Sequence, residues 1–353
     1  MLPESQLALG VDTHKDVNVA VLLDALGRKV ATAAFATTDR GNAELAEWVQ
    51  QYGEVVRAGV EGTGSYGHRL SCRLMDQGIG VIEVNRPDRS RRRRKGKSDS
   101  VDAEAAARAV LAGEASAVPK DRSGPVGELR SLLLARRSAI KARTQANNQL
   151  RALVHDLHDE MRERLDQRRP AHRARACAAL SPDNGTFKAL GVLGRRWLML
   201  HQEIQELEQS IVTLVRETVP NLLARPGIGP ITAAQLLVTA GDNPDRLRTE
   251  ASFAALCGVS PIEHSSGRCE RRRLNLGGDR VANSALWIIA HVRLVHDPRT
   301  QQYGAKRTTE GKDRKDILRR LQRYIAREVY RDITFALSPP VSSNPPPDTA
   351  TTA

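Results

Sequence analysis

Short apolar runs and helix-like stretches alternate over the first third of the chain. Strands are predicted where apolar and β-branched residues cluster between turn residues, at residues 7–12, 17–23, 29–35, 55–61 and 79–84. Helices are predicted at residues 43–51, 66–77 and the Ala-rich stretch 102–111. This order, with three strands before the first helix, predicts a mixed α/β sheet covered by helices.

In the middle of the chain, apolar residues recur every three or four positions. The later of two long stretches has an unbroken spacing of 4, 3, 4, 3, 4, 3, at Leu193, Trp197, Leu200, Ile204, Leu207, Ile211 and Leu214. The earlier stretch is less regular, at Leu129, Leu133, Ile140, Asn147, Leu150, Val154 and Leu157. Such a seam is typical of a coiled coil, as an antiparallel hairpin around the polar stretch 167–186 or as a dimerisation arm. A plain helical bundle stays an alternative, although the unbroken seam favours the coiled coil.

These patterns divide the chain into four parts. Residues 1–118 form the predicted α/β domain, and residues 119–218 form the coiled-coil helical region. Residues 219–337 are predicted to be a compact, mainly α domain. Residues 338–353 are rich in Pro, Ser and Thr and are expected to be disordered.

The charge balance indicates a polyanionic partner. The 353 residues contain 54 Lys and Arg against 41 Asp and Glu, a formal net charge of +13. The simplest partner for such an excess is nucleic acid. Aromatic residues make up only 3% of the chain, which argues against a binding surface built mainly on base stacking.

Other features of the composition bear on location. No apolar run approaches the ~20 residues of a membrane-spanning helix, and the first five residues lack the order of a secretory signal. The four cysteines are scattered, at Cys72, Cys177, Cys257 and Cys269. A disulfide framework or a structural zinc site is therefore not expected, and a reducing cytoplasm fits.

Four carboxylates occupy positions that favour a metal site. Asp12 and Glu61 end two predicted strands, whereas Asp99 and Asp102 share one face at the start of a predicted helix. Strand ends and helix N-termini meet at one edge of an α/β sheet. Four converging carboxylates would repel one another unless cations neutralised them, and a pair of Mg²⁺ ions would also serve phosphoryl transfer. Taken singly, Asp12 could cap a turn and Asp99 could cap a helix.

A basic run precedes the second pair of carboxylates. Its cations are Arg91, Arg92, Arg93, Arg94, Lys95 and Lys97, within residues 86–97. Such a run is usually a solvated loop. Because this one leads directly into two proposed metal ligands, we expect it to bind a phosphate backbone.

A second motif with candidate chemistry is Ser265-Ser266-Gly267. Four arginines follow it, at Arg268, Arg271, Arg272 and Arg273. A hydroxyl among guanidinium groups suits attack on a phosphodiester, because arginines stabilise the charge on the transferring phosphoryl oxygens. His264 could accept the serine proton, but an incidental loop histidine is the favoured interpretation. Upstream, the Gly-x-Gly turn in residues 226–230 predicts either a phosphate-binding hairpin or a tight helix–helix turn.

The motifs that carry a resemblance are Gly10-Val11-Asp12-Thr13-His14-Lys15, Glu61-Gly62-Thr63-Gly64-Ser65-Tyr66, Lys97-Ser98-Asp99-Ser100-Val101-Asp102-Ala103 and Ser265-Ser266-Gly267. In this order and spacing the chain resembles the insertion sequence 110 family of transposases, related to the Piv invertases. The resemblance extends from residue 7 to about residue 336. Ser98 stands where the family usually has threonine, and the Pro-rich tail lies outside the family pattern.

The resemblance implies a RuvC-like, RNase H-like N-terminal domain, then a coiled coil, then a transposase domain. It implies that Asp12, Glu61, Asp99 and Asp102 hold metal. It implies that Ser266, the serine directly before glycine, is the nucleophile rather than Ser265. It also implies a structured, element-encoded guide RNA as a partner.

We therefore expect a DNA recombinase that excises and inserts its own element, acting on the bacterial nucleoid. A covalent phosphoserine–DNA intermediate would preserve the phosphodiester energy. A homo-oligomer, dimer or tetramer, is expected, because a coiled coil could bring one subunit's serine to another's metals. Two alternative hypotheses are a RuvC-like nuclease without serine chemistry and a non-enzymatic nucleic-acid-binding protein.

Overall fold

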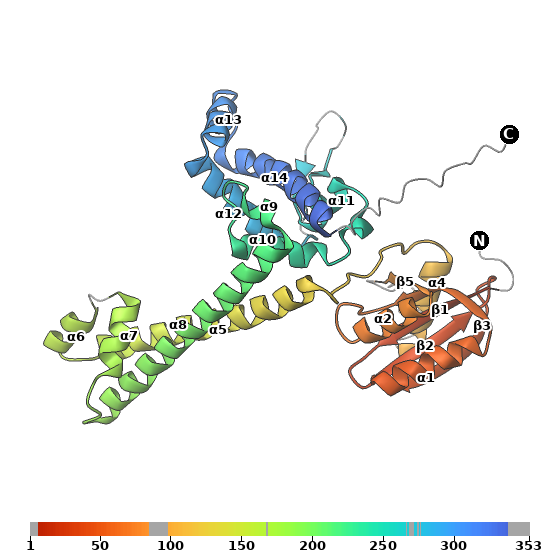
Figure 1. The fold of residues 1–353 in the computed structure, drawn as a ribbon, viewed down its shortest axis with the longest axis horizontal. Coiled ribbons are helices and arrows are strands. Elements are labelled where there is room, and N and C mark those ends of the chain that lie inside the picture. The colour runs from red at the N-terminus through yellow and green to blue at the C-terminus, as the bar shows by residue number, and fades with distance from the viewer. Residues whose placement is uncertain are drawn as a thin grey trace, which may run out of the picture. The chain divides into compact units, whose positions relative to one another are not determined.

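The computed structural model describes residues 6–84, 98–166, 169–265, 267, 275 and 277–337, together with the backbone of residues 272–273. Its contacts divide the chain into two compact units, Met1–Lys120 and Asp121–Ala353 (Figure 1). The Pro-rich tail 338–353 lies outside the described residues. Among the helices that are described, none combines the length and the apolar composition needed to cross a bilayer.

The first unit is built on one five-stranded mixed sheet, as the order of apolar runs predicts. Its strands are β1 (Gln6–Thr13), β2 (Val17–Leu23), β3 (Lys29–Ala36), β4 (Glu54–Val60) and β5 (Gly80–Glu83). They lie in the order β3-β2-β1-β4-β5. The first three strands pair antiparallel, whereas β4 is parallel to both β1 and β5.

Helices bury both faces of this sheet (Figure 1). On one face, α1 (Asp39–Gln50) and α2 (His68–Asp76) pack on a core that includes Leu9 and Leu22. On the other face, α4 (Asp99–Leu111) packs against Val21 and Leu23. Because successive side chains of a strand point to opposite faces, a sheet covered on both sides needs continuous apolar runs. This explains why the central strands show no polar alternation.

Two long helices dominate the first half of the second unit. Helix α5 (Pro125–His155) and helix α8 (Gly185–Thr218) lie side by side in opposite directions (Figure 1). The buried seam residues of α8 contact α5 of the same chain: Ile211 packs near Leu129, and Ile204 packs near Ala139. Of the two arrangements left open by the heptad pattern, the structure has the seam packed within the chain.

The connection between the long helices contains helices that its polar composition did not indicate. These are α6 (Asp159–Asp166) and α7 (Pro170–Ala178). Helix α7 packs on α8 at Gly194, where an added Cβ would lie 2.6 Å from the carbonyl oxygen of Ala174. Small residues on both helices permit this close approach, and hydropathy patterns do not detect it.

The rest of the second unit is mainly helical. Its elements are α9 (Pro220–Leu223), α10 (Pro230–Ala240), a 3₁₀ turn at Pro244–Leu247, α11 (Glu250–Leu256), β6 (Ile262–Glu263), β7 (Arg272–Arg273), α12 (Arg280–His296), α13 (Pro298–Thr309) and α14 (Arg314–Leu337). One apolar core joins α10, α12 and α14 to the adjoining ends of α5 and α8.

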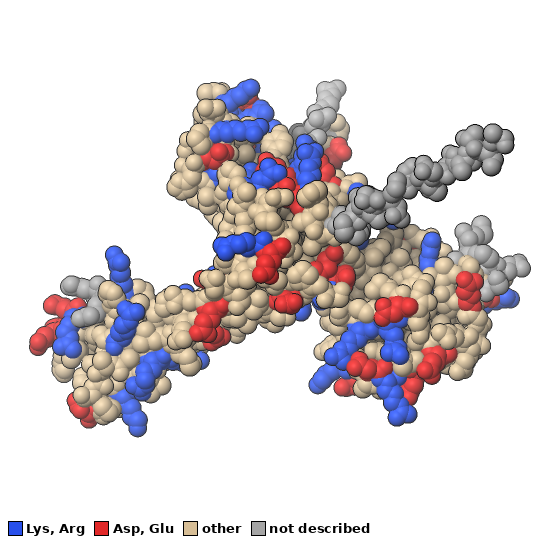
Figure 2. Space-filling model, viewed as in Figure 1, with Lys and Arg blue, Asp and Glu red and all other residues tan. Residues whose placement is uncertain are grey.

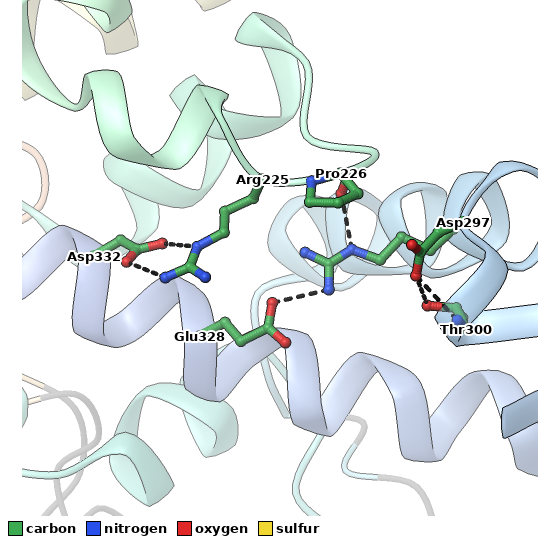
Figure 3. A network of polar contacts seen from close by, with 7 residues as sticks. Arg225, Pro226, Asp297, Thr300, Glu328 and Asp332 are labelled. Carbon is green, nitrogen blue, oxygen red and sulfur yellow. Dashed lines mark hydrogen bonds and ion pairs between the residues drawn. The ribbon is translucent and has the colours of Figure 1, made fainter.

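One side of the Gly-x-Gly turn before α10 packs against α12 at Gly227. The buried Arg293 donates from Nε to the carbonyl of Pro226 at 2.8 Å and from Nη1 to Glu328 at 2.8 Å, while Arg225 forms two hydrogen bonds to Asp332 (Figure 3). Gly227 has a φ of 72°, and an added Cβ would lie 3.2 Å from the Arg293 side chain. These contacts favour the tight helix–helix turn over a phosphate-binding hairpin.

Candidate active site

Strand pairing places Asp12 and Glu61 side by side. In the parallel β1–β4 pair, Val11 lies opposite Val60, so the next residue on each strand is one of the two acids. The backbone N–H of Glu61 donates to the Val11 carbonyl at 3.0 Å. The hydroxyl of Thr13 donates to the Glu61 carbonyl at 2.6 Å. Both acids therefore stand at the carboxyl edge of the sheet, as their strand-end positions predict.

Two glycines allow α4 to approach the same sheet face closely. An added Cβ on Gly10 would lie 2.0 Å from the Ala103 carbonyl oxygen, and one on Gly59 would lie 2.5 Å from that of Ala106. Because strand side chains alternate with period two, Asp12 shares the face of Gly10 and Glu61 shares that of Gly59. The close approach thus brings the first turn of α4, with Asp99 and Asp102, to Asp12.

Burial differs among the four acids. Asp12 and Asp102 are buried, Glu61 is half-buried and Asp99 is exposed. Burial raises the pKa of the Asp12 carboxyl, the neighbouring His14 opposes this rise, and the charges of Asp102 and Asp99 add to it. Asp12 therefore interacts electrostatically with both acids of α4, which is the convergence expected of a cation site.

His14 also belongs to this cluster, a role that its sequence motif did not predict. Its Nε2 lies 3.1 Å from Oδ2 of Asp12 and 3.4 Å from Oδ1 of Asp99. The possible ligand atoms of these three residues all lie within 4.8 Å of one another. Its position offered a signal, because His14 directly follows the end of β1, two residues after Asp12.

The side chains present fit a divalent cation. Carboxylate oxygens are ligands that Mg²⁺ prefers, and Asp12 and Asp102 are buried near each other, where two negative charges need neutralisation. Asp99 lies at the exposed side of the cluster, so the cluster is accessible from solvent there.

The serine motif lies between two short paired strands. In the β6–β7 pair, Ile262 lies opposite Arg273 and Glu263 opposite Arg272. Ser265 is exposed, and Gly267 has a φ of 54°, a left-handed conformation that favours glycine. The proposed nucleophile Ser266 lies outside the described residues, as do Arg268 and Arg271. Of Arg272 and Arg273 only the backbone is described.

Residues 258–279, called here the serine segment, contain the Ser265-Ser266-Gly267 motif. Hydrogen bonds hold the two ends of this segment together. The side-chain amide of Asn283 donates to the carbonyls of Cys257 and Gly258, both at 3.2 Å. The backbone N–H of Asp279 donates to the Leu256 carbonyl at 2.7 Å. The serine segment therefore begins and ends at fixed points, at the end of α11 and the start of α12. The cations Arg91, Arg92, Arg93, Arg94, Lys95 and Lys97 of the basic run lie outside the described residues.

Comparison with known proteins identifies relatives of both units. A family model for DEDD transposases of IS110 elements, described as a transposase, matches residues 9–158. A second, described as the transposase IS116/IS110/IS902 family, matches residues 219–305.

Individual relatives agree with these matches. The "Insertion element IS110 uncharacterized 43.6 kDa protein" of Streptomyces coelicolor is 28% identical over 207 residues, covering 57% of this chain and 48% of that protein. The "Probable family 20 transposase" of Pseudomonas aeruginosa is 31% identical over 186 residues, covering 50% and 52%. The chain thus spans about half the length of the curated relatives it matches. Since the two family matches fall in both structural units and name the same group of elements, the chain belongs to the IS110 family of transposases.

Proposed function

We propose that this protein is a transposase that excises and inserts its own insertion sequence by cutting and rejoining DNA. The observation that carries the proposal is the convergence of Asp99 and Asp102 on Asp12, beside the strand end that bears Glu61. The family match over the first unit and the mixed sheet support an RNase H-like fold for this unit.

In this proposal Asp12, Glu61, Asp99 and Asp102 hold Mg²⁺, with two ions per active site. Bound Mg²⁺ would supply charge stabilisation at the oxygens of the scissile phosphate. The residues themselves supply the fixed geometry: the close packing of α4 on Gly10 and Gly59 holds Asp99 and Asp102 near Asp12. His14, between Asp12 and Asp99, positions these carboxylates by hydrogen bonding.

Ser266 is the proposed nucleophile. Its Oγ forms a bond to phosphorus as the bond from phosphorus to a DNA oxygen breaks; the serine proton leaves to a base or solvent, and the released DNA oxygen gains a proton. The new ester keeps the phosphodiester energy, so a second DNA end can displace the serine without ATP. Arg268, Arg271, Arg272 and Arg273 are proposed to stabilise the charge on the phosphoryl oxygens.

The proposed partners are donor and target DNA, a structured guide RNA by family resemblance, and further copies of this chain as a dimer or tetramer. Arg91, Arg92, Arg93, Arg94, Lys95 and Lys97 are proposed to bind the phosphate backbone. The net charge of +13 supports such partners.

The test uses labelled DNA that carries the ends of the element, incubated with the protein and Mg²⁺. After protease treatment, a denaturing gel shows whether a covalent protein–DNA adduct has formed. Wild type should leave a peptide on one strand, and Ser266→Ala should leave none. Ser265→Ala is the matched control, since it removes the neighbouring hydroxyl, and it should retain the adduct. Asp102→Asn should abolish cleavage while DNA binding persists.

Two outcomes would contradict the proposal. An adduct that persists in Ser266→Ala would assign the chemistry to another residue. Efficient hydrolytic cleavage by wild type and by both serine variants, without any adduct, would make the protein a RuvC-like nuclease.

A further inference from the structure

The second unit contains a cavity next to the serine segment. It has a volume of about 540 Å³ and lies among α12, α14 and residues 258–261, which lead into β6. This volume falls within the roughly 300–1,000 Å³ typical of small-ligand sites. Pro261, on its wall, precedes the proposed nucleophile Ser266 by only five residues.

Two exposed aromatic rings line this cavity in a chain that has few aromatics. The exposed fractions of Trp287 and Tyr324 are 45% and 44%. The Trp287 ring stacks on His291, one turn further along α12, with ring centroids 5.2 Å apart and an interplanar angle of 7°. Tyr324 meets Tyr303 edge to face at 6.1 Å. Each ring is thus supported by a neighbour and still accessible to a ligand.

The same cavity is strongly basic. Its charged lining consists of Asp316 and four cations, Lys315, Arg319, Arg320 and Arg323, which leaves three positive charges in excess. Arg319 lies 3.3 Å from Asp316, and Arg323 lies 3.3 Å from Glu250. Nη1 of Arg323 is buried and has no hydrogen-bond partner among the described residues. Figure 2 shows Lys and Arg gathered over α13 and α14 on the face in view.

The wall of the cavity is held by buried polar contacts. Gln322 is buried and donates to the Asn283 carbonyl at 3.1 Å, while the Asn283 side chain holds the Gly258 carbonyl at 3.2 Å. These bonds connect α14, α12 and the segment that leads to the serine. A ligand bound in this cavity would therefore lie at a fixed position relative to the two ends of the serine segment.

We propose that this cavity binds an unpaired nucleotide of single-stranded nucleic acid, with its base against Trp287 and Tyr324 and its phosphates near Lys315 and Arg320. This inference rests on the proposed function, and it specifies how a strand is held beside the serine. Aromatic rings among cations match a base and its phosphate backbone. A duplex does not present base faces to such a concave site, so the site selects an unpaired strand.

The experiment measures binding of the full-length protein to fluorescein-labelled oligonucleotides by anisotropy, without Mg²⁺. The probes are a single-stranded 12-mer DNA, an RNA of the same sequence and the corresponding 12-base-pair DNA duplex. Trp287→Ala should weaken binding of single strands about tenfold or more, the factor expected from one lost base–aromatic stack. Binding of the duplex should change less than about twofold.

Two variants serve as controls. Trp287→Phe keeps an aromatic ring and should retain most single-strand binding. Phe335→Ala removes another exposed ring of α14, 77% exposed and outside the cavity lining, and should have no effect. Replacing adenine by 2-aminopurine in the DNA probe provides a second readout, because stacking quenches its fluorescence and Trp287→Ala should relieve this quenching.

The outcomes separate the pocket from the chemistry. Equal losses for single strands and duplex, or no loss at all, would overturn the pocket even where wild type forms the covalent adduct. Selective loss of single-strand binding supports the pocket even if no adduct forms. The ratio of RNA to DNA affinity in wild type identifies which of the two strands the pocket holds.

Discussion

At the scale of single residues, the buried Asp12 carboxylate destabilises the metal-free fold. Burial and two neighbouring acids raise the pKa of Asp12, so its ionised form is less stable in the folded chain than in the unfolded chain. Asp12→Asn should therefore raise the melting temperature in EDTA at neutral pH. The gain should disappear below pH about 4, where aspartate is protonated in both states. Differential scanning calorimetry across pH measures both effects.

With Mg²⁺ present, Asp12→Asn should no longer be more stable than wild type. Adding Mg²⁺ should raise the melting temperature of wild type, because binding to the folded state alone stabilises it. Asp12→Asn should lose this rise. Asp76→Asn, at the exposed end of α2, is the matched control and should behave as wild type. A lower melting temperature for Asp12→Asn in EDTA would contradict the argument.

At the scale of elements, the contact between α4 and the sheet depends on glycine. Gly10→Ala should place a Cβ 2.0 Å from the Ala103 carbonyl, which is backbone and cannot turn aside. Overpacking of this kind costs about 1–3 kcal/mol or more. Because the displaced helix carries Asp99 and Asp102, the Mg²⁺-induced rise in melting temperature should shrink as well.

A matched glycine tests whether the position matters. Gly185 begins α8 and has open space around its Cβ position. Gly185→Ala should leave both the urea denaturation midpoint and the Mg²⁺ response unchanged. If Gly10→Ala behaved in the same way, the close packing of α4 would not be what positions the acids.

The start of α5 depends on a residue far away in the sequence. Oδ2 of Asp242 accepts from the Gly124 N–H and Oδ1 from the Val126 N–H, both at 3.1 Å, which satisfies two amides at this helix end. Asp242→Ala should lower the free energy of unfolding by about 1 kcal/mol, the usual value of a helix cap. Urea denaturation followed by circular dichroism measures the change.

The conservative variant separates capping from charge. Burial raises the pKa of Asp242, although these backbone N–H groups oppose the rise, so its ionised form is less stable in the folded chain than in the unfolded chain. Its stabilising effect therefore comes from hydrogen bonding and not from charge. Asp242→Asn keeps one acceptor oxygen and should therefore destabilise less than alanine. Equal losses for the two variants would assign the effect to the charge.

At the scale of the whole molecule, the α5–α8 pair stabilises the second unit from within. Ile204 and Ile211 have exposed fractions of 3% and 0%. Ile204→Asp with Ile211→Asp would bury two unpaired carboxylates, at several kcal/mol. Calorimetry should show loss of the second unit's transition rather than simple dissociation of subunits.

The outer face of α8 offers a control with the same charge change. Val192 and Met199 are 51% and 63% exposed. Val192→Asp with Met199→Asp should leave the melting temperature nearly unchanged. Light scattering on the Val192→Asp, Met199→Asp double variant also reports whether this face of α8 holds copies of the chain together. If both double variants kept the wild-type mass and melting temperature, the packed seam would be refuted.

The basic run at residues 91–97 is proposed to bind the phosphate backbone of nucleic acid. Replacing Arg91, Arg92, Arg93 and Arg94 by Ala should flatten the salt dependence of DNA affinity, by up to roughly 0.9 in the log–log slope per lost phosphate contact. The control removes the same charge elsewhere in the first unit, by alanine at Arg28, Arg40, Arg69 and Arg73. Equal slopes for the two variants would show that only net charge matters.

Some features of this protein follow from the sequence alone. Apolar periodicity predicted the mixed sheet, the long helices and the strand-end places of Asp12 and Glu61. These predictions are confirmed because the periodicity of apolar residues reflects local backbone geometry, with 3.6 residues per helical turn and two per strand repeat. The motif order was also enough to identify the family that the comparisons then supported.

Other features were decided only by the tertiary structure. The sequence left open whether the α8 seam contacts its own chain, and the fold packs α8 on α5. The sequence assigned His14 no role, and the fold places it between Asp12 and Asp99. The low aromatic content argued against a binding surface built mainly on base stacking, and the fold brings Trp287 and Tyr324 to one cavity. Each of these depends on contacts between segments distant in sequence. Such contacts are selected by how shapes fit at close packing, and a one-dimensional pattern contains no information on that fit.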